Sequence, residues 1–170
     1  AILFISKQLT LTKWQEGWVV SAVLVGAILG AAVIGPMSDR FGRKKLLLLS
    51  SIIFLVGAVW SGLAPDFAHL VASRIVLGLA VGGASSLIPT YLSEMAPADK
   101  RGGVASLFQM MIMTGILVAY ISNYLLQDFT FGWRIMLALA ALPALALFFG
   151  GLVLAESPRY LVRQGDNEAA

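Results

Sequence analysis

The feature that most restricts the fold of this chain is a series of apolar runs, each long enough to cross a lipid bilayer. Short stretches that hold most of the charge separate these runs. About 20 helical residues, at a rise of about 1.5 Å each, cross a hydrocarbon core of about 30 Å. Backbone groups cannot stay unpaired in lipid, and no run alternates as a barrel strand would, so helices are predicted. We expect spans at about residues 17–37, 46–64, 68–92, 103–126 and 134–154.

The composition supports this class of protein and excludes others. Apolar residues make up 59% of the chain and charged residues 12%, which indicates an all-α, polytopic transmembrane bundle. The pI near 9.5 does not indicate nucleic-acid binding, because the basic residues gather at loops. Cysteine is absent and His69 is the single histidine, so neither a cysteine-based nor a multi-histidine metal site is expected. The spans lack paired carboxylates and a nucleophile beside a base, so we expect no enzyme and no cofactor.

The distribution of Lys and Arg predicts the orientation in the membrane. Basic residues are concentrated at 38–45, at 93–102 and in the C-terminal tail, whereas the opposite side holds only Lys7, Lys13 and Arg134. Because basic loops stay preferentially in the cytoplasm, these two loops and the tail are expected to be cytoplasmic. The protein is therefore predicted to be a multi-pass protein of the cell membrane.

The two ends of the chain are interpreted as parts of longer elements. The apolar stretch at 1–6 is too short to span and lacks the features of a signal peptide. Residues 1–16 are therefore expected to hold the end of a truncated first helix and an external loop. Residues 17–154 would form five helices, and residues 155–170 the start of a cytoplasmic linker.

The loop after the first span carries a pattern that topology alone does not explain. Residues 35–45 read G-P-M-S-D-R-F-G-R-K-K. Gly35 and Gly42 permit a tight reversal, and Asp39 and Arg43 stand four residues apart, close enough to pair. The segment resembles the signature loop of the major facilitator superfamily, G-x-x-x-D-R-x-G-R and two basic residues, at every named position.

A second pattern, from Val76 to Arg101, resembles the more specific signature of the sugar porter family. Two glycines four residues apart are followed at the family's spacing by an aromatic residue, a glutamate and an arginine. The segment E-S-P-R-Y-L at 156–161 resembles the family's P-E-S-P-R box after helix six, with Ala155 in place of the leading proline. The resemblance implies helices 2–6 of a presumed twelve, that is, most of the N-terminal half.

Charges at the predicted cytoplasmic helix ends alternate in sign. A single exposed ion pair contributes about 0–1 kcal/mol, so only a network could favour one conformation over another. The resemblance implies a gate between the two halves that is closed when the cavity faces outward; topology and solubility offer a simpler account. The expected gate residues are Asp39, Arg43, Glu94, Arg101, Glu156 and Arg159.

Arg74 is the single charge inside the predicted hydrocarbon region. A charge there is costly and should face a cavity or a carboxylate, unless it snorkels to the outer interface. No predicted span has Asp or Glu in its interior, so an intramembrane partner would lie outside this sequence. In bacterial relatives a first-helix aspartate pairs with this arginine, and the resemblance therefore implies a role for Arg74 in proton coupling.

A polar face of the span at 103–126 is the predicted sugar site. Its glutamine amide offers donors and an acceptor for sugar hydroxyls, although an interhelical hydrogen bond would use it equally well. The sugar porter family has a glutamine at the matching step, which favours the sugar. At 100° per residue the neighbouring residues share or flank this face, and the expected contacts are Gln109, Ile112, Met113, Ile116 and Tyr120.

Small residues and prolines predict how the helices pack and bend. Two G-x-x-x-G pairs let backbones approach closely and are expected at helix contacts: Gly26 with Gly30, and Gly78 with Gly82. Pro89 and Pro143 each remove a backbone hydrogen bond and should bend their helices.

These observations predict a secondary active transporter that carries a monosaccharide by alternating access, as a sugar:proton symporter. Its partners would be the sugar, the proton, the bilayer, and the first helix and C-terminal half of the same protein, with no nucleic acid. Facilitated diffusion without proton coupling and a non-transporting sugar receptor on the same fold remain alternatives. A carboxylate in the preceding helix would favour symport, and a long cytoplasmic tail would favour a receptor.

Overall fold

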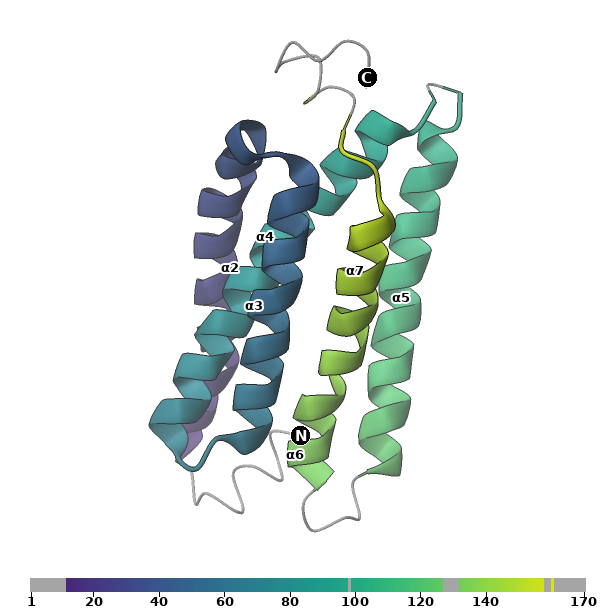
Figure 1. Cartoon of the computed structure of the whole chain (residues 1–170). Coiled ribbons are helices and arrows are strands. Elements are labelled where there is room, and N and C mark those ends of the chain that lie inside the picture. Colours follow the sequence, from purple (N-terminus) through teal and green to yellow (C-terminus); the bar gives the residue numbers. More distant parts are fainter. Residues whose placement is uncertain (1–11, 98, 127–131, 158–159, 161–170) are drawn as a thin grey trace.

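The computed structural model describes residues 12–97, 99–126, 132–157 and 160, and it shows a bundle of nearly parallel and antiparallel helices (Figure 1). No strand occurs within these ranges. The helices are α2 (Lys13–Phe41), α3 (Arg43–Leu63), α4 (Phe67–Met95), α5 (Arg101–Leu125), α6 (Gly132–Leu139) and α7 (Ala141–Val153).

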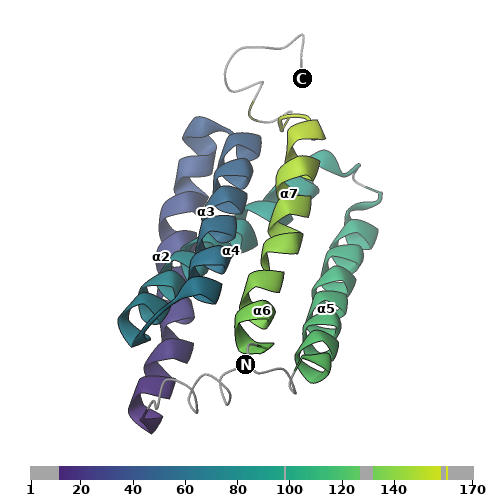
Figure 2. The same ribbon diagram turned by 60° about the horizontal axis from the view of Figure 1, so that its bottom comes forward.

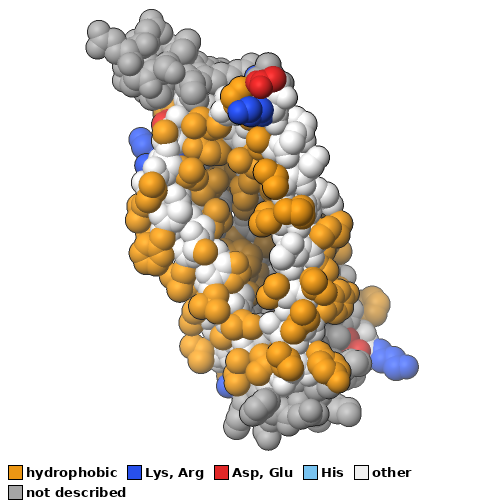
Figure 3. Space-filling model, turned by 90° about the vertical axis from the view of Figure 1, so that its right-hand side faces the viewer, with side chains coloured by type: hydrophobic (Ala, Val, Ile, Leu, Met, Phe, Trp, Pro, Cys, Tyr) orange, Lys and Arg blue, Asp and Glu red, His pale blue; other side chains and the backbone are white. Residues whose placement is uncertain are grey.

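Five helical stretches are long and apolar enough to cross a membrane, and α6 and α7 together form the fifth. Figure 3 shows hydrophobic side chains along the length of one face, with charged side chains at its two ends. Because a lipid-exposed surface must be apolar over the hydrocarbon depth, this distribution is that of a membrane-embedded bundle. The all-α, polytopic architecture expected from the apolar runs is confirmed.

The charged loop at 38–45 differs from the prediction. Helix α2 continues to Phe41 and α3 begins at Arg43, so Gly42 alone separates them. Gly42 has φ +96°, a value that L side chains rarely adopt. Gly35 lies inside α2, so its expected part in the reversal is wrong. The charged residues of the motif therefore lie at helix ends and not in a loop.

Helices α2 and α4 pack closely because glycines line their contact. A methyl group added at Gly78 would overlap the Val23 carbonyl oxygen, and one added at Gly82 would overlap that of Ala27. Gly26 and Gly30 are equally tight against the backbone of α4. The expected role of both G-x-x-x-G pairs in helix contacts is confirmed. We call this contact the glycine seam.

Helix α5 is packed very differently. None of its residues is buried among the described residues, and Figures 1 and 2 both show it at the far side of the bundle from α2. Its contacts are with α4 and, at the other end, with α6. Most of its surface is therefore uncovered by the rest of the described chain.

The two prolines have different consequences. The last span is interrupted at Ala140, whose N–H donates to the Leu137 carbonyl at 3.3 Å. Pro143 falls in the first turn of α7, where a missing N–H costs little because that N–H has no intrahelical acceptor. The expected distortion near Pro143 is thus observed, whereas Pro89 does not interrupt α4.

Candidate functional site

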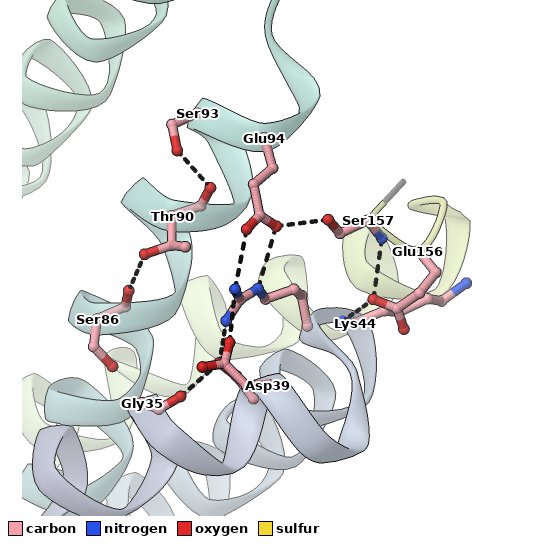
Figure 4. Close-up of polar contacts among 11 residues, drawn as sticks. Gly35, Asp39, Lys44, Ser86, Thr90, Ser93, Glu94, Glu156 and Ser157 are labelled. Carbon is pink, nitrogen blue, oxygen red and sulfur yellow. Dashed lines mark hydrogen bonds and ion pairs between the residues drawn. The ribbon is translucent and has the colours of Figure 1, made fainter. Parts of the chain in front are cut away.

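A charge cluster lies where the ends of α2, α3, α4 and α7 meet (Figure 4). Arg43 is central to it, because it forms ion pairs with both Asp39 and Glu94. Two nitrogens of Arg43 reach the two carboxylate oxygens of Glu94, at 3.2 Å from Nε and 3.0 Å from Nη2. The same Nη2 lies 2.9 Å from Oδ1 of Asp39. The side chains of Arg43 and Glu94 are only 13% and 6% exposed. This bidentate ion pair is therefore largely shielded from solvent, and its geometry is specific.

Two buried serines complete the cluster. Ser38 accepts a hydrogen bond from Nη1 of Arg43 and donates to the Gly35 carbonyl. Ser157 donates to Oε2 of Glu94 at 2.6 Å. Neither serine was predicted from the sequence, although one lies within each of the two charged motifs at 35–45 and 156–161. Their hydroxyls fix the orientation of both charged groups, because each hydroxyl bonds directly to one of them.

Two described residues that follow α7, Ala155 and Glu156, contact these helix ends. Tyr91 donates its hydroxyl to the Ala155 carbonyl at 2.7 Å. Glu156 accepts the backbone N–H of Lys44 at 3.0 Å. Residues distant in sequence therefore form one polar layer at this end of the bundle.

The structure brings together only part of the expected gate. Asp39, Arg43 and Glu94 form ion pairs. Arg101 donates to the Ala96 carbonyl at 3.4 Å, and Glu156 bonds to backbone N–H groups. Neither has an ion-pair partner within the described ranges, and Arg159 lies outside them. Whether these residues act as a gate stays a prediction.

The expected sugar contacts lie on one exposed face of α5. Gln109 is exposed, as are Met113 and Ile116, and Tyr120 is 71% exposed. Ile112 also lines a mainly apolar cavity of about 270 Å³, together with side chains of α3, α4 and α7 such as Phe54 and Ser85. The described chain supplies one wall for a ligand at Gln109 but does not enclose it.

Arg74 lies on α4 within a predicted span. Its Nε is buried and has no hydrogen-bond partner among the residues that the structure describes. A buried cationic group without a partner is costly. No carboxylate of the described ranges pairs with this nitrogen. The described residues also contain no group of three or more His, Asp and Glu that could hold a metal ion.

Comparison with known proteins identifies the family. The profile described as "Sugar (and other) transporter" matches residues 5–170. The chain belongs to this family, whose relatives are named as transporters and not as enzymes. A D-xylose transporter of Levilactobacillus brevis is 66% identical over 170 residues, which are all of this chain and 37% of the relative. A galactose-proton symporter of Escherichia coli K12 is 42% identical over 160 residues, 94% of this chain and 34% of the relative.

A solved structure shares the fold. The proton:xylose symporter XylE of the major facilitator superfamily, bound to 6-bromo-6-deoxy-D-glucose, superposes with a TM-score of 0.91 at 30% identity. The match covers 99% of this chain and 42% of XylE. The resemblance to the sugar porters and the major facilitator fold expected from the sequence are confirmed. The chain spans well under half the length of these relatives.

Proposed function

We propose that the protein to which this chain belongs is a secondary active transporter that carries a monosaccharide across the cell membrane with a proton. The similarity to a D-xylose transporter at 66% identity makes xylose the first sugar to test. The names of the galactose-proton symporter and of XylE support the proton. Alternating access, in which two halves rock around a central site, is the mechanism that this fold supports.

The main support for the proposed substrate site is the uncovered polar face of α5. Gln109 projects from a helix that has no buried residue in the described chain. A sugar hydroxyl that leaves water loses about 1–3 kcal/mol unless it finds a partner, and the amide of Gln109 can both donate and accept. Ile112, Met113, Ile116 and Tyr120 would line the same side of the cavity, which other parts of the protein would close.

The coupling proposal rests on Arg74. Its buried Nε lacks a partner in the described chain, and a buried cation favours a nearby carboxylate. A carboxylate elsewhere in the protein would hold Arg74 while ionised and release it when protonated. Proton binding and sugar binding would then favour the same conformation, which is the requirement for coupling.

The gate proposal concerns the charge cluster at the end of the bundle. The shielded Arg43–Glu94 pair and its neighbour Asp39 would stabilise one conformation of the transporter, with Arg101, Glu156 and Arg159 added as the motifs suggest. An ion pair that is shielded from water contributes more than an exposed one only if its hydrogen bonds are satisfied. The hydrogen bond that Ser38 accepts from Arg43 and the one that Ser157 donates to Glu94 meet this condition.

Uptake by cells that carry the complete protein tests the proposed function. Radiolabelled xylose and a panel of hexoses and pentoses are offered with and without a protonophore. Accumulation that collapses with the protonophore supports symport, whereas uptake that only equilibrates and ignores it indicates facilitated diffusion. No uptake of any sugar by correctly inserted protein would favour a receptor or a different solute.

A matched pair of variants on α5 locates the site. Gln109→Ala should weaken uptake, because the sugar loses its amide partner. Thr114→Ala removes a polar group about 140° around the same helix, where the hydroxyl donates only to the Met110 carbonyl of α5 at 2.9 Å. Equal effects of both substitutions would contradict a sugar site at Gln109.

The orientation is proposed from the basic residues, with the charge cluster on the cytoplasmic side. The chain contains no cysteine, so single cysteines can be introduced here once any cysteine elsewhere in the full protein has been replaced. An impermeant maleimide added to intact cells should label Lys13→Cys and spare Lys45→Cys. The reverse pattern would overturn the orientation.

A further inference from the structure

The start of α3 lacks the side chain that usually caps a helix. Its first residue is Arg43, and the preceding Gly42 offers no cap hydrogen bond. The N–H groups of a first helical turn have no acceptor within their own helix, and a Ser, Thr, Asp or Asn before the helix commonly supplies one. At φ +96° the backbone of Gly42 disfavours such residues. The acceptor must therefore come from elsewhere.

Glu156 provides this acceptor from 112 residues further along the chain. Its Oε1 accepts the Lys44 N–H at 3.0 Å and the Ser157 N–H at 3.1 Å. Its Oε2 lies 2.8 Å from the position that a Cβ on Gly42 would take. The carboxylate of Glu156 thus fills the place of the missing cap side chain (Figure 4).

The end of α7 is capped in return. Helix α7 ends at Val153, and the carbonyls of a last helical turn lack intrahelical donors. The Nζ of Lys44 donates to the Leu152 carbonyl at 2.9 Å. The charges also suit the helix dipoles, because the anion lies at a helix start and the cation at a helix end.

The geometry points to a reciprocal cap in which Glu156 and Lys44 fasten the start of α3 to the end of α7. Within the described residues, Glu156 then acts as a hydrogen-bond acceptor for backbone N–H groups. It is a positioning residue for the charge cluster: it holds the turn of α3 that begins with Arg43, and the next residue, Ser157, bonds to Glu94. This role does not depend on which solute is carried.

Amide hydrogen exchange of the full-length protein in lipid nanodiscs tests the reciprocal cap. In Glu156→Gln the side-chain amide oxygen can still accept the Lys44 N–H, so the protection of that amide should be kept. In Glu156→Ala and in the longer Glu156→Met the acceptor is lost. Exchange at Lys44 should then rise roughly fivefold, the factor that loss of one helix cap produces in an opening equilibrium.

Two further variants distinguish the cap on α3 from the cap on α7, and the role of Glu156 from that of Glu94. Lys44→Met keeps its own backbone N–H, so it should leave exchange at residue 44 unchanged and raise it in the last turn of α7. Glu94→Gln should disturb the cluster as a loss of charge would, because Glu94 pairs with Arg43. Removal of the charge alone is thus expected to leave the Lys44 amide protected in Glu156→Gln but to disturb the charge cluster in Glu94→Gln.

The proposal is overturned if Glu156→Gln exchanges as fast as Glu156→Met, since charge would then be required. It is equally overturned if Glu156→Met leaves the Lys44 amide protected. Should Glu156→Met and Glu156→Ala fail to fold, Lys44→Met must still loosen the end of α7 alone. Hydrogen exchange is measured independently of transport activity. The reciprocal cap can therefore be refuted while the proposed function stands, and the proposed function can be refuted while the cap stands.

Discussion

Helices α2 and α5 both flank α4, and both are apolar and long enough to cross a membrane. Helix α2 buries Val19, Ala22 and Ile34 as well as the two glycines of its seam. Helix α5 buries nothing within the described chain. Apolar composition therefore does not decide which helices pack together.

The difference follows from the physics of packing in lipid. Lipid tails are as apolar as leucine side chains, so burying a leucine between helices gains little. Close backbone approach gains dispersion contacts, and only small residues permit it. The glycine seam thus fixes α2 on α4, whereas the uncovered face of α5 is free to carry polar groups for a ligand.

The largest effect is expected from filling the glycine seam. In Gly82→Leu the new side chain would collide with the backbone of α2 at Ala27, which cannot move aside as a side chain could. We expect destabilisation of about 3 kcal/mol or more, at or beyond the upper end of ordinary overpacking. The yield of monodisperse full-length protein and its thermal midpoint in detergent measure the effect.

Gly17→Leu serves as the control for the glycine seam. Gly17 also lies on α2, but nothing stands within 4 Å of an added Cβ. A substitution at an exposed site of this kind usually changes the free energy of unfolding by no more than about 0.5 kcal/mol. If both variants lost the same stability, helix propensity or insertion and not the seam would be responsible.

A smaller effect is expected from the shielded ion pair that ties α4 to the start of α3. Glu94→Gln leaves the guanidinium of Arg43 without its main partner, and we expect a loss of about 1–3 kcal/mol. Asp39 is 49% exposed, so Asp39→Asn should cost at most about 1 kcal/mol. Thermal midpoints of Glu94→Gln, of Arg43→Met and of the Arg43→Met/Glu94→Gln double variant give the coupling energy of the pair. Additive losses would show that the pair does not stabilise the folded protein.

Gln109→Ala on α5 should have the opposite profile to a change in the seam. The exposed amide contributes no packing in the described chain, so the thermal midpoint should stay within the error of the wild type. The Kd for the transported sugar should rise roughly 5- to 150-fold, which corresponds to a lost partner worth about 1–3 kcal/mol. Calorimetric titration of purified full-length protein measures it. A large fall in thermal midpoint with an unchanged Kd would instead assign Gln109 to an interhelical hydrogen bond.

Much of the fold could be predicted from the sequence, because bilayer thickness sets the length of the apolar runs. The helix ends could not, since α2 continues through the charged motif to Phe41. The G-x-x-x-G spacing indicated close contacts, but only the structure shows that Gly26 and Gly78 face each other.

The candidate site was predictable in part for a similar reason. Asp39 and Arg43 are close in sequence, and the short reversal at Gly42 keeps the end of α2 beside the start of α3, so the two side chains meet. The bond from the Lys44 N–H to Glu156 joins positions 112 residues apart. Every residue except proline has such an N–H, so no residue type in the sequence marks the partner. The charges in the sequence therefore placed Glu156 in a network at the helix ends, but they could not indicate that within the described residues its carboxylate caps α3.

The smallest predicted effect lies at the start of α4, away from both the seam and α5. Asp66 caps α4 by accepting the His69 N–H at 2.9 Å, and this bond lowers the pKa of Asp66 below its usual 3.8, with a further contribution from the His69 ring. A carboxylate whose pKa is lower in the folded state stabilises the fold above about pH 4. The stabilisation is lost as the pH falls through the folded-state pKa.

Asp66→Asn keeps a cap acceptor but does not titrate. The difference in thermal midpoint between wild type and Asp66→Asn should therefore shrink between pH 5 and about pH 2.5, and a difference that stays constant over this range would show that the carboxylate does not couple to folding.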